Sequence, residues 1–134
     1  MLKGSCLCGA IRYRITGPVF RMSHCHCSMC RKGHGAAFGT YLNTAPEHFA
    51  FERGEANVGR YTSSPGVIRS FCTVCGSTLQ WYETRPGAAI GIAAGTLDDD
   101  PGLRADKHIY VASKAPWYEL PEDGLARDAG PLPG

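Results

Sequence analysis

The chain has 134 residues, 43% of them hydrophobic, and a formal net charge of only +2. That length and apolar fraction suit one compact domain with one core, while the small charge speaks against a dedicated nucleic-acid binder, which usually carries a strongly basic face. No apolar run approaches the length of a membrane span, and none precedes Cys6 as a secretory signal would require, so we expect a cytoplasmic protein with no membrane partner.

Short strands separated by turns are predicted along the whole chain. Residues 11–15 alternate apolar and polar side chains, which is the period of a half-buried strand, and residues 78–82 are enriched in β-branched and aromatic types. Gly (17) and Pro (9) interrupt nearly every interval, and no long stretch keeps helical spacing. The sequence therefore predicts an all-β fold. In chain order, the predicted strands are 11–15, 19–24, 37–42, 47–51, 58–61, 67–71, 78–82, 90–94 and 108–112.

Other segments are expected to be turns or tail. A short helical turn fits after Cys27 or near Leu97, and residues 98–102, with three aspartates before Pro and Gly, read as an exposed turn. The residues after 122 are rich in Gly, Pro and charge. We therefore expect a zinc-binding domain over 1–122 and a short, poorly ordered tail over 123–134.

The cysteines predict metal binding rather than disulfide bonding. Their number, seven, is odd, and disulfides would leave one thiol over. In a reducing compartment, cysteines are more often metal ligands or catalytic groups than disulfide partners. They fall into three tight clusters, whereas a disulfide framework spreads its cysteines to close long loops. The clusters are Cys6 with Cys8, Cys25 with Cys27 and Cys30, and Cys72 with Cys75.

The first and last clusters predict one closed zinc site. Zinc prefers four tetrahedral ligands, and C-x-C and C-x2-C turns can each present two sulfurs to one ion. Gly9 and Gly76 follow the second cysteine of each pair, where a positive φ would let the backbone turn and aim its amides at the sulfurs. The alternative is that either pair consists of buried free thiols. We expect four zinc ligands, which are Cys6, Cys8, Cys72 and Cys75.

The central cluster offers Cys25, Cys27 and Cys30, with no cysteine left for a fourth ligand. Three protein ligands and one open position are typical of catalytic zinc. Two alternatives stay open: His24 or His26 closes the site and makes it structural, or the cluster is a redox-active or empty thiol group. On a strand, residues two apart share a face, so both histidines would point away from a metal that Cys25 and Cys27 face.

Basic and titratable residues surround the central cluster. Arg31, Lys32 and His34 follow it directly, and they could balance the negative charge of three thiolates, meet an anionic substrate, or simply be solvated. The candidates for proton transfer are His24, His26, His34 and His108, against the alternative that each is a packed or exposed histidine without such a role.

The cysteine motifs, taken together, resemble those of the glutathione-dependent formaldehyde-activating enzyme family, also called the centromere protein V domain. The similarity covers roughly residues 4–120 and consists of three ordered cysteine motifs and a Lys-Ala-Pro-Trp segment. The segments that carry it are Gly4-Ser5-Cys6-Leu7-Cys8-Gly9-Ala10-Ile11-Arg12-Tyr13, His24-Cys25-His26-Cys27-Ser28-Met29-Cys30-Arg31-Lys32, Phe71-Cys72-Thr73-Val74-Cys75-Gly76-Ser77-Thr78-Leu79, His108-Ile109-Tyr110-Val111 and Ser113-Lys114-Ala115-Pro116-Trp117.

This resemblance implies a β-tent fold of coiled antiparallel sheets organised around zinc, with two zinc ions per chain. It implies a structural zinc on Cys6, Cys8, Cys72 and Cys75 and a catalytic zinc on Cys25, Cys27 and Cys30. Members of the family are carbon–sulfur lyases, and the founding activity condenses formaldehyde with glutathione to S-hydroxymethylglutathione. We therefore expect a zinc-dependent lyase or synthase that acts on a small thiol adduct, with glutathione as the candidate thiol. The alternative is a non-catalytic, zinc-stabilised module that binds a protein or nucleic acid.

Overall fold

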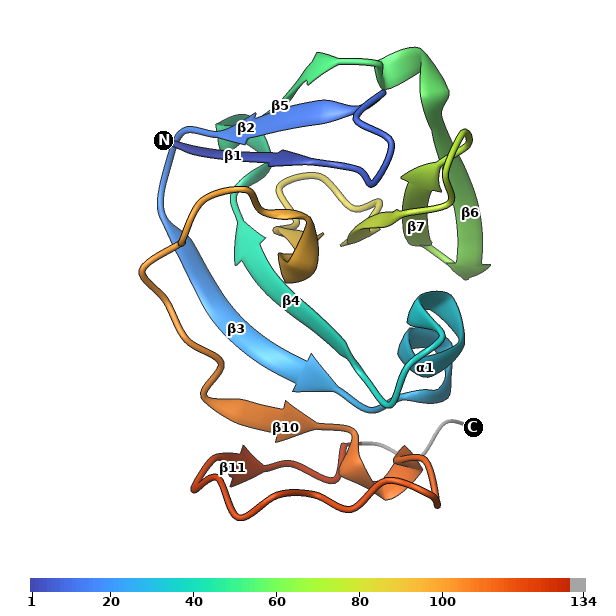
Figure 1. Ribbon diagram of the computed structural model, residues 1–134, viewed down its shortest axis with the longest axis vertical. Coiled ribbons are helices and arrows are strands. Elements are labelled where there is room, and N and C mark those ends of the chain that lie inside the picture. Colours follow the sequence, from blue (N-terminus) through green and yellow to red (C-terminus); the bar gives the residue numbers. More distant parts are fainter. Residues whose placement is uncertain (131–134) are drawn as a thin grey trace. The chain divides into compact units, whose positions relative to one another are not determined.

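The structure, a computed structural model, describes residues 1–130, and most of its regular secondary structure consists of short β-strands (Figure 1). The predicted all-β class is confirmed. The strands are β1 (Leu2–Ser5), β2 (Arg12–Ile15), β3 (Val19–Cys25), β4 (Gly39–Thr44), β5 (Phe49–Arg53), β6 (Val58–Ser64), β7 (Val67–Cys72), β8 (Thr78–Glu83), β9 (Ile90–Ala93), β10 (Lys107–Ile109) and β11 (Ala126–Arg127). The α-helix is α1 (Ser28–His34), and 3₁₀ turns occupy Pro46–His48, Glu55–Asn57, Ala94–Thr96 and Val111–Ser113. None of these helices has the length and apolar character needed to cross a membrane.

Each predicted strand overlaps a strand of the structure, but several are partly wrong. Residues 37–38 precede β4, and Ala94 lies in a 3₁₀ turn rather than in β9. Residues 47–48 form a 3₁₀ turn instead, since the fixed φ of Pro46 favours the start of a helical turn. Residues 111–112 also lie in a 3₁₀ turn, so β10 ends at Ile109. The short helical turn expected after Cys27 is present as α1, and a 3₁₀ turn lies just before Leu97.

Strand β1 was not predicted, because Lys3, Gly4 and Ser5 have weak strand preference. It forms through pairing with β2, in a register that sets Gly4 opposite Tyr13. A Cβ atom on Gly4 would lie 2.1 Å from Cζ of Tyr13, so only glycine leaves room for the tyrosine ring across this position of β1.

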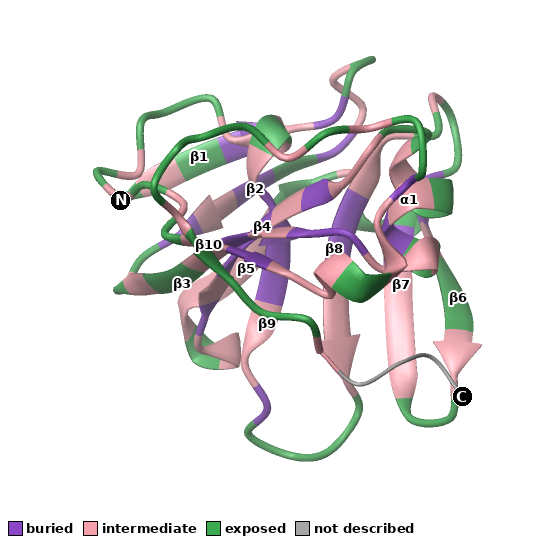
Figure 2. Cartoon of the chain, turned by 90° about the horizontal axis from the view of Figure 1, so that it is seen from below, coloured by how far each residue is buried: buried purple, intermediate pink, exposed green. Residues whose placement is uncertain are grey.

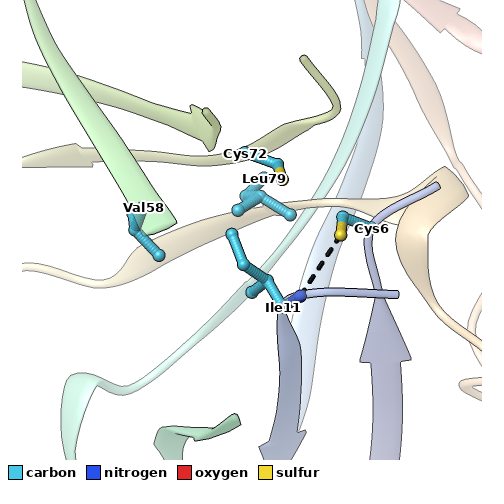
Figure 3. Close-up of a cluster of buried hydrophobic side chains, with 5 residues drawn as sticks. All are labelled: Cys6, Ile11, Val58, Cys72 and Leu79. Carbon is cyan, nitrogen blue, oxygen red and sulfur yellow. Dashed lines mark hydrogen bonds between the residues drawn. The ribbon is translucent and has the colours of Figure 1, made fainter. Parts of the chain in front are cut away.

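The chain divides into two compact units, and the first comprises residues 1–20 and 42–103. In it, β1, β2 and β5 form an antiparallel sheet, while β4, β9, β8, β7 and β6 lie in that order. Buried positions run along β9, which is coloured mainly as buried in Figure 2. One core cluster of this unit contains Cys6, Ile11, Val58, Cys72 and Leu79 (Figure 3). Two cysteines are therefore part of the hydrophobic core.

The second unit comprises residues 21–41 and 104–134. Its strands lie in the order β11, β10, β3 and β4, and β10 pairs in parallel with both β3 and β11. Residues 123–130 belong to the segment that the sequence assigned to a tail, and β11 within it is hydrogen-bonded to β10. The remainder of that segment, 131–134, lies outside the described residues.

Candidate metal centres

Four cysteines of the first unit come together as one group, which we name the four-cysteine cluster (Cys6, Cys8, Cys72 and Cys75). Their sulfur atoms all lie within 4.8 Å of one another, a spacing at which they could hold one metal ion. The Sγ of Cys8 lies 3.6 Å from that of Cys6 and 3.9 Å from that of Cys72, across a sequence separation of 64 residues. Cys6 and Cys72 are buried, while Cys8 is exposed.

Two turns with left-handed glycines shape this cluster. Gly9 has φ 78° and Gly76 has φ 82°, as expected from their place after each cysteine pair. A Cβ on either glycine would meet nothing within 4 Å, so the requirement for glycine is conformational rather than steric.

Backbone amides point at the sulfurs of the cluster. The amide of Ile11 donates to Cys6 Sγ at 3.3 Å, a contact drawn in Figure 3. The amides of Val74 and Cys75 donate to Cys72 Sγ at 3.4 and 3.5 Å. Hydrogen bonds to sulfur favour the thiolate, which is the form that binds metal.

The thiols of the cluster differ in their proton affinity. The hydroxyl and amide of Ser77 hold the pKa of Cys75 down to about 5. At Cys8 the amide of Ala10 lowers the pKa, but burial and the neighbouring thiol of Cys6 outweigh it and raise the value to about 11. Four adjacent thiols cannot all ionise without a cation between them, whereas a divalent ion deprotonates its thiol ligands outright. The donor set and the amide hydrogen bonds therefore fit a closed tetrathiolate zinc site.

The second group, which we name the three-cysteine cluster (Cys25, Cys27 and Cys30), belongs to the second unit. Its sulfurs also lie within 4.8 Å of one another. Cys25 is the last residue of β3, Cys27 caps the N-terminus of α1, and Cys30 lies in the first turn of that helix. The cap is made by sulfur, because Cys27 Sγ accepts a hydrogen bond from the amide of Cys30 at 3.3 Å.

Neither His24 nor His26 belongs to the three-cysteine cluster, as expected. The strand alternation behind this expectation does not extend past Cys25, because the chain leaves the strand there and turns into the helix at Cys27. Nδ1 of His24 lies 2.7 Å from Thr40 Oγ1, and His26 bonds to His108.

Proximity of the thiols dominates the electrostatics of this cluster. Hydrogen bonds from Cys25 to Cys27 and Cys30, followed by burial, raise the pKa of the Cys25 thiol far above its ordinary value. The cluster therefore resists carrying three negative charges unless a cation shares the site. Three soft thiolate donors fit zinc, and they leave one tetrahedral position to another ligand.

The basic residues of α1 have separate roles. Arg31 Nε donates to the carbonyl of Ser113 at 3.2 Å, which ties the helix to the 3₁₀ turn Val111–Ser113. Nε2 of His34 lies 2.8 Å from the hydroxyl of Tyr41. Lys32 is exposed, and all three side chains lie toward the end of α1, where positive charge interacts favourably with the helix dipole.

A buried histidine pair joins the segment of the three-cysteine cluster, which contains His26, to β10, which contains His108. His26 Nε2 is 2.9 Å from His108 Nδ1, and His108 Nε2 is 2.8 Å from a carboxylate oxygen of Asp123. Burial, followed by the nearby His108 and His24, lowers the pKa of His26 to about 4. Sequence reasoning named both histidines but missed Asp123, because no local pattern distinguishes that residue from the other charges after position 120.

Comparison with known proteins identifies relatives over most of the chain. The family model described as glutathione-dependent formaldehyde-activating enzyme matches residues 1–113. A Halomonas elongata protein is 31% identical over 90% of this chain and 81% of its own length, and it is provisionally named as a glutathione-dependent formaldehyde-activating enzyme. A Schizosaccharomyces pombe protein named as an uncharacterized lyase is 28% identical over 88% of this chain and 84% of its own. A crystal structure of a Rhodobacter sphaeroides protein shares the fold, with a TM-score of 0.62 at 22% identity over 75% of this chain and 92% of that one.

Proposed function

The chain belongs to the glutathione-dependent formaldehyde-activating enzyme family, and from this premise we propose that it is a zinc-dependent carbon–sulfur lyase acting on a small thiol adduct. The first candidate substrate is S-hydroxymethylglutathione, the adduct of glutathione and formaldehyde. The family match and the names of the two relatives support a lyase, and the thiol clusters support zinc.

The observation that carries this proposal is the difference between the two clusters. The four-cysteine cluster supplies a complete set of thiolates, so we assign it to a structural zinc ion. The three-cysteine cluster supplies one ligand fewer, so we assign it to a catalytic zinc ion. When bound there, zinc supplies an electrophilic position that favours the thiolate form of a substrate thiol.

The protein's own residues prepare the catalytic cluster. Burial of Cys25 and Cys30 keeps water away from two of the three sulfurs, while Cys27 is half-buried. Helix α1 fixes Cys27 and Cys30 relative to each other through the sulfur cap. Exposed Lys32, on the same helix, is a candidate partner for the carboxylates of glutathione.

In the lyase direction, the C–S bond of the hydroxymethyl thioether breaks and its electron pair leaves with sulfur. The hydroxyl proton is lost to solvent as the C–O bond becomes the C=O bond of formaldehyde, and the sulfur takes up one proton, so the products are formaldehyde and a thiol. The synthase direction is the reverse of these steps. Holding the sulfur and the carbonyl carbon in one orientation lowers the barrier in both directions.

We propose a cytoplasmic location, because the seven cysteines gather in two clusters that could hold metal and none of them forms a disulfide, as expected in a reducing compartment. A second candidate function is a zinc-stabilised binding module. It is favoured by exposed apolar side chains at the tips of the cysteine loops, where Leu7 is 87% and Val74 is 64% exposed.

The test is the rate at which free formaldehyde hydrate exchanges with S-hydroxymethylglutathione, measured by NMR exchange spectroscopy at equilibrium. The zinc-loaded protein should raise this rate above the spontaneous rate in proportion to its concentration, and Cys27→Ser should abolish the increase. Asp128→Ala is a matched control, because this exposed carboxylate accepts a hydrogen bond from the amide of Gly130 and contacts neither cluster. An exchange rate independent of protein concentration for glutathione and for other small thiols would refute the proposal and favour the binding module.

A further inference from the structure

A chain of hydrogen bonds connects Asp123 to His26, the residue between two thiols of the three-cysteine cluster. Asp123 Oδ2 lies 2.8 Å from His108 Nε2, and His108 Nδ1 lies 2.9 Å from His26 Nε2. The two histidines are buried, at 0% and 1% exposure, whereas the side chain of Asp123 is 29% exposed. All three residues belong to the second unit of the chain, so the connection lies within one compact unit.

The order of these contacts determines where the ring protons lie. An ionised carboxylate only accepts hydrogen bonds, so a neutral His108 carries its proton on Nε2 and accepts at Nδ1. His26 must then donate from Nε2, which leaves its Nδ1 without a proton. That Nδ1 is buried and has no hydrogen-bond partner among residues 1–130, and a bare acceptor is the less unfavourable of its two states there.

The main chain around His26 is also held by β10, the strand that contains His108. The amide of His26 donates to the carbonyl of Ile109 at 2.9 Å, and the pairing of β3 with β10 sets Ile109 opposite Cys25. The ring of His26 also lies against Phe38 and Tyr118, with centroid separations of 5.1 and 5.9 Å. The position and the rotation of His26 are therefore both determined by residues beyond the cluster.

We propose that His108 and Asp123 are positioning residues for the three-cysteine cluster. They hold His26 in one tautomer and one orientation, and so fix the backbone from which the flanking thiols of Cys25 and Cys27 project. The inference rests on the proposed role of the cluster as a metal centre, and it is independent of which adduct is the substrate. Residues that orient metal ligands from behind typically change metal affinity about 10–100-fold when they are replaced.

The test compares zinc affinity at the two clusters of the full-length chain by competition with chelators of graded strength. Asp123→Ala should weaken zinc binding at the three-cysteine cluster about 10–100-fold. Affinity at the four-cysteine cluster should stay unchanged, which gives an internal control in the same molecule. Asp128→Ala, which removes a carboxylate from the same segment without a histidine partner, should change neither affinity.

Long-range proton–nitrogen NMR of the imidazoles provides a readout that general destabilisation would not produce. The unmodified protein should show His26 protonated only at Nε2, and Asp123→Ala should lose this single state. Asp123→Asn keeps the size of the side chain but adds an amide donor, so it permits the chain to reverse and should populate His26 protonated at Nδ1. This conservative variant also keeps the proposal testable if Asp123→Ala fails to fold.

Failure of the positioning role is separable from failure of the proposed function. The positioning role is overturned if Asp123→Ala binds the second zinc ion as tightly as the Asp128→Ala control, or if the unmodified protein carries the His26 proton on Nδ1. Asp123→Ala can weaken zinc binding at the three-cysteine cluster as expected while the unmodified protein has no activity toward any thiol adduct. That result would overturn the lyase and leave the positioning role standing. A protein that binds only one zinc ion would overturn both.

Discussion

Replacing Cys72 with serine should unfold the first unit, whereas the same change at Cys27 should remove one metal ion and leave the fold in place. Cys72 is fully buried and lies among Ile11, Val58 and Leu79 (Figure 3). Its sulfur is thus both a member of the four-cysteine cluster and a part of the hydrophobic core.

The expected loss at Cys72 is large compared with the stability of a small domain. A structural zinc site contributes about 10–16 kcal/mol in zinc-finger peptides, and whole domains are stable by about 5–15 kcal/mol. A serine hydroxyl is a poor zinc ligand. It would also lie in a core position where the Cys72 sulfur accepts hydrogen bonds from two backbone amides. We therefore expect a loss of at least about 5 kcal/mol in the free energy of unfolding, enough to consume the stability of a marginal domain.

The change at Cys27 is milder for a structural reason. Cys27 caps α1 by accepting the amide of Cys30, and serine is a preferred N-cap residue that makes the same hydrogen bond. The expected change in the free energy of unfolding of the metal-free chain is therefore below about 1 kcal/mol. Metal binding at the three-cysteine cluster should be lost, because two thiolates remain.

The assay is urea denaturation at a fixed free zinc concentration low enough to leave the three-cysteine cluster empty, followed by the fluorescence of Trp81 in β8. Zinc content per chain is measured separately at saturating zinc. Trp117 is 71% exposed, so the series is measured in a Trp117→Phe background to keep one reporter. The reasoning is refuted if Cys27→Ser lowers the denaturation midpoint as far as Cys72→Ser does, or if Cys72→Ser keeps the midpoint of the parent chain.

Three other outcomes are expected. A mild chelator should remove the ion of the three-cysteine cluster before that of the four-cysteine cluster, because the chelator can bind the ion at the coordination position that the protein leaves open. Zinc should then be released in two steps, and release in one step would contradict this expectation. Gly76→Ala should lower the free energy of unfolding by about 1–2 kcal/mol in the same urea assay, because alanine disfavours the φ of 82°. The control is Gly95→Ala, which should change that free energy by less than about 0.5 kcal/mol, because Gly95 has a φ outside the left-handed region and open space at its Cβ. Burial raises the pKa of Tyr13 to about 12, so the neutral phenol contributes stability that is complete below pH 10 and is lost as the pH rises through about 12. A titration followed by phenolate absorbance should show one tyrosine that ionises near pH 12, and Tyr13→Phe should remove that ionisation.

The sequence was sufficient to predict the features that depend on local spacing. Each cysteine cluster contains short pairs, and the glycines after Cys8 and Cys75 have the positive φ that their positions require. Alternation of apolar side chains located β2, and turn residues separated most of the other strands. The grouping of Cys6 and Cys8 with Cys72 and Cys75 was also predicted, because two incomplete half-sites with the same local form satisfy one tetrahedral ion.

Features that depend on tertiary contacts were not predictable. Strand β1 contains residues of weak strand preference, and it exists because Gly4 accommodates the ring of Tyr13. Asp123 lies in a segment whose composition suggests a tail, yet it contacts a histidine 15 positions earlier in the chain. Neither contact leaves a periodic pattern in the sequence, since a single residue carries each one.

The spacing of the cysteines also sets an order of events during synthesis of the chain. The sulfurs of Cys8 and Cys72 are separated by 64 residues, so the four-cysteine cluster stays incomplete until β7 and the turn after it have been synthesised. The three-cysteine cluster lies within a strand end and one helical turn, so its thiols emerge close together and before Cys72. A nascent chain therefore completes its set of thiols first at the centre proposed for catalysis and second at the centre proposed to brace the core.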